Sequence, residues 1–298
     1  MSVTDIDEGL VRSLLQEQHP DLAELDLRRV PGGWDNQLWR LGDELAVRMP
    51  RTPRAPSLLR NEHRWLPVLA PRLPLPVPTP VRIGAPSARF PRPWTVVAWV
   101  PGEPADRGAV TRDHHAAGTL ARFLTALHHE APAEAPANPF REALLRSRTD
   151  EFEERFHVVE GTGLAAEARA VWFDAVAAPL WKEPPVWIHG DFHPANVVLA
   201  DGTVAGVIDF GDLCAGDPAT DLAAAWLLLP AGADTRFLEL YGRPDEAMIR
   251  RARGWAVLRS LSLIGIGLAW ERGLPGGQPT WGRAGRTALE RVLRSQWQ

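Results

Sequence analysis

A short β-hairpin inside an otherwise helical region constrains the fold of this chain more than any other feature. Two apolar runs, Val197–Ala200 and Thr203–Ile208, flank Asp201-Gly202, which is a favoured two-residue hairpin turn. Pairing across this turn predicts that Asn196 lies roughly 7 Å from Asp209 at the backbone, because each strand residue advances about 3.3 Å. One hairpin therefore predicts that two oxygen-bearing side chains converge.

These two side chains suit a hard cation. Carboxylate and amide oxygens are typical Mg²⁺ ligands, and Mg²⁺ is usually held by few protein groups together with phosphates. Asp191 lies five residues before Asn196, in a loop after the strand that ends at His189. A carboxylate beside the metal could orient an attacking hydroxyl or accept its proton. Phosphoryl transfer needs little else from a protein beyond positioning and charge neutralisation.

The rest of the chain divides by pattern into a strand-rich beginning and a helical remainder. Residues 5–18 have helical spacing, and Gly42-Asp43 separates two strand-like runs. Pro67 should end or kink the next helix. The predicted strands are 25–30, 37–41, 45–49, 81–83, 94–100 and 186–189. The predicted helices are 58–69, 111–129, 141–158, 164–181, 218–229, 235–241, 245–270 and 282–297. Pro101 to Pro104 breaks regular structure, so we predict lobes at 1–100 and 105–298 joined by a hinge at 101–104.

Composition excludes several function classes. The formal net charge of −4 gives no reason to expect nucleic acid or an anionic membrane as a partner. One cysteine, Cys214, cannot form an intrachain disulfide, and the first 18 residues lack the apolar core of a secretory signal. Arg259 interrupts the apolar stretch 255–270, so no membrane span is expected. These features indicate a cytoplasmic protein, while its oligomeric state is not predicted.

Two other enzyme classes lack their signatures. A P-loop requires Gly-Lys-Ser/Thr, yet the only lysine, Lys182, is followed by Glu183. No G-x-S-x-G nucleophile elbow occurs either. The scarcity of lysine favours arginine throughout the chain, including at sites where another protein would use lysine.

The motif order resembles that of kinases. His189-Gly190-Asp191, Asn196 and Asp209-Phe210-Gly211 match the H-R-D, Asn and D-F-G elements in order and spacing. The form HGDFHPAN…IDFGD, followed by GDP and DLA, resembles the aminoglycoside phosphotransferase family of antibiotic kinases. The resemblance implies an α+β, bilobal, protein-kinase-like fold, with a small antiparallel-sheet N-lobe and a larger, mainly helical C-lobe that carries the acceptor site.

The same resemblance implies site residues. Asp191 corresponds to the catalytic base, and Asn196 and Asp209 to the Mg²⁺ ligands, with ATP or GTP as phosphoryl donor. Arg48 stands where the family usually has a lysine that contacts phosphates, and Glu62 is its candidate partner. Arginine keeps the charge but has a planar fork, so the geometry must differ. A plain surface ion pair is the alternative for these two residues.

The remaining nucleotide-binding candidates come from a loop and from the predicted hinge strand. Gly33, Trp34, Asp35 and Asn36 occupy the place of the phosphate-covering loop, although the full G-x-G-x-x-G is absent. The resemblance implies that the backbone of Ala98 and Val100 hydrogen-bonds the purine.

Other polar residues have structural interpretations. His189 is interpreted as anchoring its loop by hydrogen bonds rather than as a metal ligand, and Asp217 and Asp221 as N-capping and loop-bracing groups rather than as catalysts. The Gly265-x-Gly267 pair indicates close helix packing. Of the 13 tryptophans, Trp226, Trp255, Trp270 and Trp281 are candidates for lining a substrate pocket.

The sequence predicts a small-molecule O-kinase but leaves the acceptor open. An antibiotic such as an aminoglycoside or a macrolide fits the resemblance. Residues 230–298 hold 11 arginines against 6 acidic residues, whereas residues 131–185 hold 10 acidic residues against 6 basic ones. This mixed signal tilts the prediction slightly toward an acceptor less cationic than an aminoglycoside. Two alternatives stay open: a metabolic small-molecule kinase of the same fold, and a nucleotide-binding pseudokinase.

Overall fold

Two compact units make up the chain. The computed structural model describes residues 6–141 and 144–295. The N-terminal unit comprises Met1–Arg72, Pro76–Pro101 and Val207–Gly211, and the C-terminal unit comprises Leu73–Leu75, Gly102–Gly206 and Asp212–Gln298. The Asp209-Phe210-Gly211 segment thus belongs to the N-terminal unit, although it lies late in the sequence. In the part of the chain that the structure describes, no helix is long and apolar enough to cross a membrane.

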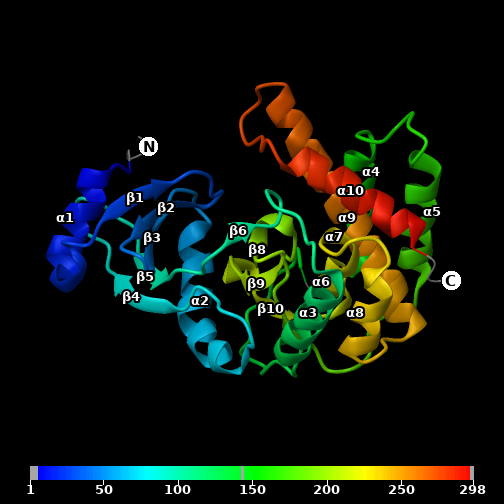
Figure 1. Cartoon of the computed structure of the whole chain (residues 1–298), viewed down its shortest axis with the longest axis horizontal. Helices are drawn as coiled ribbons and strands as arrows, with labels where there is room; N and C mark the ends of the chain where they lie inside the picture. The colour runs from blue at the N-terminus through cyan, green and yellow to red at the C-terminus, as the bar shows by residue number, and fades with distance from the viewer. Residues whose placement is uncertain (1–5, 142–143, 296–298) are drawn as a thin grey trace. The chain divides into compact units, whose positions relative to one another are not determined.

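A five-stranded antiparallel sheet forms the core of the N-terminal unit (Figure 1). Its order is β1 (Leu27–Val30), β2 (Asn36–Leu41), β3 (Leu45–Pro50), β5 (Trp94–Ala98) and β4 (Pro80–Gly84). Leu41 pairs with Leu45, so the predicted turn at Gly42-Asp43 contains three residues rather than two. Side chains alternate between the faces of the sheet, and each face contacts a different helix.

Helix α1 (Glu8–Gln18) covers one face of this sheet and begins at Asp7, whose carboxylate accepts a hydrogen bond from Leu10 N. Its buried leucines pack with Val47 and Met49 of β3. Helix α2 (Ala55–Leu69) provides the partner of Arg48, which points to the opposite face.

The prediction that Pro67 ends or kinks α2 needs correction. The helix continues two residues beyond it and is followed by a 3-10 turn. Proline lacks the N–H that would bond the His63 carbonyl group, but the residues after it can stay helical, and the helix ends at Leu69, within one turn of Pro67.

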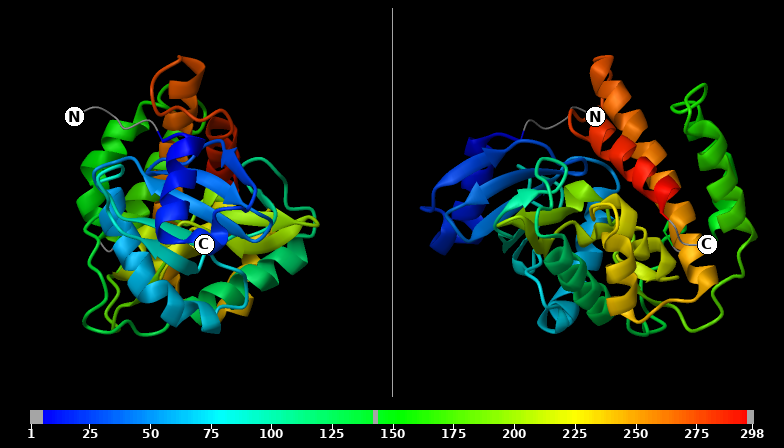
Figure 2. Two further views of the ribbon diagram at one scale, coloured as in Figure 1. Left: turned by 90° about the vertical axis from the view of Figure 1, so that its left-hand side faces the viewer. Right: turned by 45° about the vertical axis from the view of Figure 1, so that its right-hand side comes forward.

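The C-terminal unit is mainly helical (Figures 1 and 2). Its helices are α3 (Asp113–Leu127), α4 (Thr149–Phe156), α5 (Ala165–Ala177), α6 (Ala219–Leu222), α7 (Ala224–Leu227), α8 (Ala233–Tyr241), α9 (Glu246–Glu271) and α10 (Trp281–Arg294). Together with the sheet of the N-terminal unit, they confirm the α+β class with a mainly helical C-lobe. Several predicted helices are shorter than expected: 164–181 is reduced to α5, 218–229 is split into α6 and α7, and the described part of 141–158 begins with a 3-10 turn.

Two small sheets interrupt these helices. Strand β7 (Val186–Ile188) pairs with β10 (Cys214–Gly216), and β6 (Glu103–Pro104), β8 (Val197–Ala200) and β9 (Thr203–Val207) form the second sheet. The predicted hairpin is confirmed, because Asp201 and Gly202 both have positive φ, as a type I′ turn requires. Residues 103–104, predicted to lack regular structure, instead pair with β8.

Glycine contacts bring α9 and α10 together, and the views agree that these helices lie side by side (Figures 1 and 2). A Cβ added at Gly267 would lie 2.2 Å from the Gly282 Cα atom. One added at Gly265 would meet only the Val158 Cγ1 atom, at 3.8 Å. Gly267 is therefore a packing glycine, whereas Gly265 has room for a methyl group.

Gly267→Ala should lower the free energy of unfolding by about 1–3 kcal/mol, because two backbones would have to separate. Gly265→Ala is the matched control on the same helix and should raise stability by up to about 1 kcal/mol through helix propensity. Urea unfolding followed by circular dichroism measures both. Equal effects of the two substitutions would show that the close approach of α9 and α10 does not limit stability.

Candidate active site

The predicted catalytic loop, residues 189–196, lies between β7 and β8. Strand β7 ends at Ile188, and a 3-10 turn, Pro194–Asn196, leads into β8. Gly190 has a φ of +78°, and a Cβ there would lie 2.9 Å from the Asp212 carbonyl oxygen. This position requires glycine, since other residues rarely adopt such a φ and would also clash. The tight turn places Asp191 against the interior of the unit.

Asp191 is held by two arginines that the sequence did not single out. One carboxylate oxygen, Oδ1, lies 2.8 Å from Arg141 Nη2 and 2.9 Å from Arg259 Nη1. The other oxygen, Oδ2, has longer contacts, at 3.4 Å to Asn196 Nδ2 and 3.5 Å to His193 Nε2. The carboxylate is thus fixed by charge-assisted contacts on one side.

These contacts keep Asp191 ionised. Burial alone would raise the pKa of Asp191, but Arg141, Arg259 and His193 hold that pKa well below its usual range. Burial and repulsion from Arg141 lower the pKa of Arg259 to about 10, which leaves it cationic at neutral pH. A carboxylate of such low basicity is suited to orienting a hydroxyl more than to removing its proton early.

The side chain of Asn196 is fixed by hydrogen bonding to its own loop. Its amide nitrogen donates to the Asp191 backbone oxygen at 3.0 Å. Because the amide nitrogen makes this bond, the carbonyl oxygen, Oδ1, is the atom of this side chain that could serve as a metal ligand. Among the described residues no cluster of three or more His, Cys, Asp or Glu side chains forms a metal site. Asn196 in the C-terminal unit and Asp209 in the N-terminal unit each carry an oxygen donor. That donor chemistry fits Mg²⁺.

Asp221 holds the backbone of the catalytic loop by hydrogen bonds. Its fully buried carboxylate accepts the backbone N–H groups of His189 at 2.6 Å and Gly190 at 2.9 Å. His128 Nε2 lies 3.2 Å from the same carboxylate, and His128 Nδ1 lies 2.8 Å from the Tyr241 hydroxyl. His189 itself accepts the Asp191 N–H through Nδ1. A chain of buried polar groups therefore runs from α8 and α3 to the catalytic loop.

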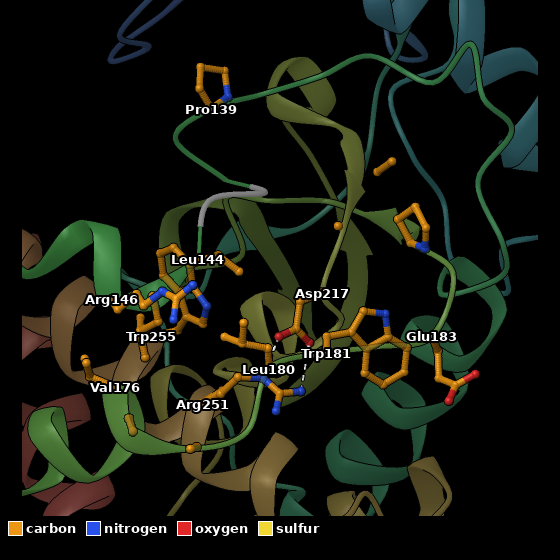
Figure 3. Close-up of a pocket in the computed structure, with 16 residues that line it drawn as sticks. Pro139, Leu144, Arg146, Val176, Leu180, Trp181, Glu183, Asp217, Arg251 and Trp255 are labelled. Atoms are coloured by element: carbon orange, nitrogen blue, oxygen red, sulfur yellow. Dashed lines mark hydrogen bonds and ion pairs between the residues drawn. The ribbon is translucent and has the colours of Figure 1, made fainter.

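Asp217 serves a different part of the unit. It accepts the Ala219 N–H at 3.0 Å and pairs with Arg251 of α9 at 2.6 Å. This pair borders a cavity of about 590 Å³, where Figure 3 shows Trp181 and Trp255 on either side of Leu180. Asp191 is not among the residues that line this cavity, so the cavity is separate from the catalytic loop.

The tryptophans proposed to line a substrate pocket have different positions. Trp255 lines this cavity, and Trp226 is buried and donates to Asp234. Trp281 packs edge-on against His193, with 5.0 Å between ring centroids, and is therefore the one that contacts the catalytic loop. Trp270 is exposed on α9.

In the N-terminal unit, Arg48 bridges two carboxylates. Arg48 Nη1 lies 2.5 Å from Glu62 Oε2, and Nη2 lies 3.5 Å from Asp209 Oδ1. Burial raises the pKa of Glu62, while Arg48 counteracts this shift. Burial opposes the charge of Arg48, yet Glu62 and Asp209 outweigh it and raise the pKa of Arg48. Arg48 and Glu62 therefore form a buried pair and not a surface one.

Asp209 has a backbone conformation that is uncommon for its type. Its φ is +64°, in the left-handed region, and its side chain is about half exposed. Non-glycine residues held in this region often occur at functional sites, because the surrounding structure must impose the strain. The conformation directs an acidic side chain outward next to Arg48.

Arginines hold the predicted phosphate-covering loop by its carbonyl groups. Arg51 donates to the backbone oxygens of Gly32, Gly33 and Trp34. Asp35 is paired with Arg54 through both carboxylate oxygens, so its side chain is already engaged within the N-terminal unit. Gly33 has a φ of +76°, and a Cβ there would collide with the Asn36 carbonyl oxygen at 2.4 Å. Trp34 is half exposed, and the buried Asn36 begins β2.

Strand β5, which leads to the predicted hinge, bears on the purine contact expected at Ala98. The Ala98 N–H donates to the Thr79 carbonyl oxygen at 2.9 Å. Any purine contact at Ala98 must therefore use its carbonyl group. Val100 is buried and lies two residues beyond Ala98, the last residue of β5. It follows Trp99, whose N–H donates to the Glu44 carbonyl oxygen.

The chain matches a known family over most of its length. The family described as "Phosphotransferase enzyme family" (APH) matches residues 26–260. The chain belongs to this phosphotransferase family. The matched segment contains Arg48, the catalytic loop and Asp209, and also Arg259.

Two curated relatives share part of the sequence. Viomycin phosphotransferase of Streptomyces vinaceus is 28% identical over 189 residues, covering 58% of this chain and 63% of the relative. Aminoglycoside 3′-phosphotransferase of Streptomyces fradiae is 34% identical over 189 residues, covering 56% of this chain and 67% of the relative. The match thus spans about two thirds of each relative.

Solved structures of phosphotransferases share the fold. The GDP and kanamycin complex of APH(2″)-IIIa has a TM-score of 0.72 at 20% identity, covering 95% of this chain and 97% of that one. A macrolide 2′-phosphotransferase from Brachybacterium faecium has a TM-score of 0.61 at 24% identity, covering 92% and 97%. These similarities confirm the bilobal kinase-like fold of the phosphotransferase family.

Proposed function

We propose that this chain transfers the terminal phosphoryl group of ATP or GTP to a hydroxyl of a small molecule, with an antibiotic as the acceptor class. The observation that carries the proposal is the catalytic loop, where Asp191 is ionised and Asn196 is oriented by a 3.0 Å bond to the Asp191 backbone. Membership of the phosphotransferase family and the names of the curated relatives support it.

The proposed reaction uses few protein groups. Asp191 orients the acceptor hydroxyl, whose oxygen forms a bond to the terminal phosphorus while the bond to the leaving nucleoside diphosphate breaks. The hydroxyl proton passes to Asp191 late in the reaction, as befits a loose transition state. Asn196 and Asp209 are the proposed Mg²⁺ ligands, and the ion would neutralise charge on the phosphates. Arg48, oriented by Glu62, is the proposed phosphate contact.

The charges beside Asp191 support an acceptor of low positive charge. Arg141 and Arg259 balance the negative charges of Asp191 and of Asp212, which pairs with Arg141. The charge of the reacting carboxylate is therefore offset at short range by arginine, whereas a polycation favours a negative site. A macrolide or a similar natural product fits these surroundings better than an aminoglycoside.

An acceptor panel tests the proposal. Purified protein is incubated with Mg²⁺ and either ATP or GTP, and with kanamycin, viomycin or erythromycin, and phosphorylated product is detected by mass spectrometry. We expect a higher kcat/KM for erythromycin than for kanamycin. Strong turnover of kanamycin alone would reverse the acceptor preference. Failure of both nucleotides to bind would contradict the kinase proposal itself, and binding without transfer would favour a pseudokinase.

A further inference from the structure

The two oxygens of Asp191 have unequal surroundings. Oδ1 receives two guanidinium contacts below 3 Å, whereas the contacts of Oδ2 are 3.4 Å and 3.5 Å long. A carboxylate oxygen offers about two lone-pair sites. The sites of Oδ1 are therefore filled by the protein, while Oδ2 can accept a further short hydrogen bond.

Arg259 reaches this carboxylate from the middle of α9. It holds the loop at two points, because Nη1 binds Asp191 Oδ1 and Nη2 binds the Gly190 carbonyl oxygen at 2.5 Å. Its neighbours Leu258 and Ser260 on the helix are buried. A guanidinium in such a place is costly unless it is paired, so its pairing with the loop is a specific arrangement.

Arg141 approaches the same oxygen from a different segment and is itself held in place. Arg141 Nε and Nη2 bind Asp212 Oδ2 at 3.0 Å and 2.6 Å, and Asn138 donates to Asp212 Oδ1. The Asp212 carboxylate thus fixes the Arg141 fork before any substrate is present. Two guanidinium groups with separate anchors meet on one oxygen of Asp191.

We propose that Arg259 and Arg141 are positioning residues that hold Oδ1 of Asp191 and thereby assign Oδ2 to the acceptor hydroxyl. The inference rests on the proposed kinase function and adds two residues to its machinery. Neither arginine has to touch the substrate. Their effect is to fix the rotation of the Asp191 carboxylate, so that the attacking oxygen is aligned in each turnover.

Arg259→Gln is the principal test, with Arg253→Gln as its matched control. Arg253 also lies partly buried on α9, but it donates to the Val292 carbonyl oxygen of α10. We expect Arg259→Gln to lower kcat by about 10- to 100-fold with the KM for nucleotide unchanged, and Arg253→Gln to retain both constants. Arg259→Lys should recover part of kcat, because it keeps the positive charge but cannot bind Asp191 Oδ1 and the Gly190 carbonyl oxygen at the same time as the planar guanidinium does.

A double-mutant cycle separates positioning from a general structural role. In the Asp191→Ala background, Arg259→Gln should cause little further loss of transfer, because the group that it positions is gone. An undiminished further loss would overturn the inference, as would equal kcat values for the Lys and Gln variants. Where transfer by Asp191→Ala falls below detection, the comparison of the Lys and Gln variants decides.

Folding and the proposed function are tested separately. Thermal unfolding checks each variant, and Arg141→Gln provides a second route if Arg259→Gln does not fold; it should also lower kcat without changing the nucleotide KM. If Asp191→Ala keeps wild-type transfer, the proposed function is wrong. If Asp191→Ala is inactive and both arginine variants have wild-type kcat, only the positioning role is wrong.

Discussion

Asp191→Asn should lower kcat for phosphoryl transfer by about 10³-fold. The amide cannot take the proton of the acceptor hydroxyl, and its NH₂ group would face the donors of Arg141 or Arg259 or else the hydroxyl itself. Nucleotide affinity should change little, since Asn196 and Arg48 are intact. Steady-state kinetics with the best acceptor, together with calorimetric titration of Mg²⁺-nucleotide, measures both effects.

Asp201→Asn is the matched control for this prediction. Asp201 lies in the type I′ turn between β8 and β9 with a φ of +49°, a conformation that asparagine adopts readily. The same chemical change should therefore leave kcat and stability unaltered. Retention of more than about a tenth of wild-type kcat by Asp191→Asn would mean that another group orients the acceptor hydroxyl.

Asp221→Asn should have the largest effect on stability, lowering the free energy of unfolding by about 3 kcal/mol. The carboxylate accepts the N–H groups of His189 and Gly190 with no exposure to solvent. An amide would present its own donors to these groups or leave them unsatisfied. Guanidinium unfolding measures the loss, and kcat should fall as well, because the same two residues precede Asp191.

The pH dependence of this loss has a defined sign. Burial would raise the pKa of Asp221, but the hydrogen bond and charge of His128 and the Gly190 N–H lower it below the ordinary value. A carboxyl with a depressed folded-state pKa contributes stability above its unfolded pKa of about 3.9 and loses it as the pH falls through the folded value. The difference between wild type and Asp221→Asn should thus be full at neutral pH and shrink in acid.

Asp245→Asn is the control for Asp221. Asp245 caps α9 by accepting the Met248 N–H, a role that asparagine performs equally well. The Asp245→Asn variant should have the same guanidinium unfolding midpoint as the wild type. If Asp221→Asn did so too, the buried carboxylate would not be what holds the catalytic loop.

The local parts of the site were predictable from sequence because neighbouring residues generate them. The hairpin follows from Asp201-Gly202 alone, and the spacing of Asp191 and Asn196 is a property of one loop. The division into a strand-rich beginning and a helical remainder followed from the change of periodicity along the chain, and the α+β class from the family resemblance. The end of α2 was expected at Pro67 but falls at Leu69, because a proline removes one bond to the preceding turn and the residues after it can stay helical.

The supporting residues could not be predicted, because they arrive from distant segments. Arg259 lies 68 residues from Asp191 in sequence, and His128 lies 93 residues from Asp221. One signal for Arg259 was nevertheless present. A lone charge interrupts the apolar stretch 255–270, and such a residue needs a buried partner. The same interruption argued against a membrane span, without indicating what the arginine binds.

Arg48 in place of lysine has a consequence for chemical labelling. Reagents that carry an acyl group on a nucleotide phosphate modify kinases by acylating a nearby lysine amine. The guanidinium of Arg48 stays protonated and is a poor nucleophile, and the only lysine, Lys182, lies in the C-terminal unit. Such probes should leave this position unlabelled, so surveys of cell extracts that rely on lysine capture there would overlook the protein.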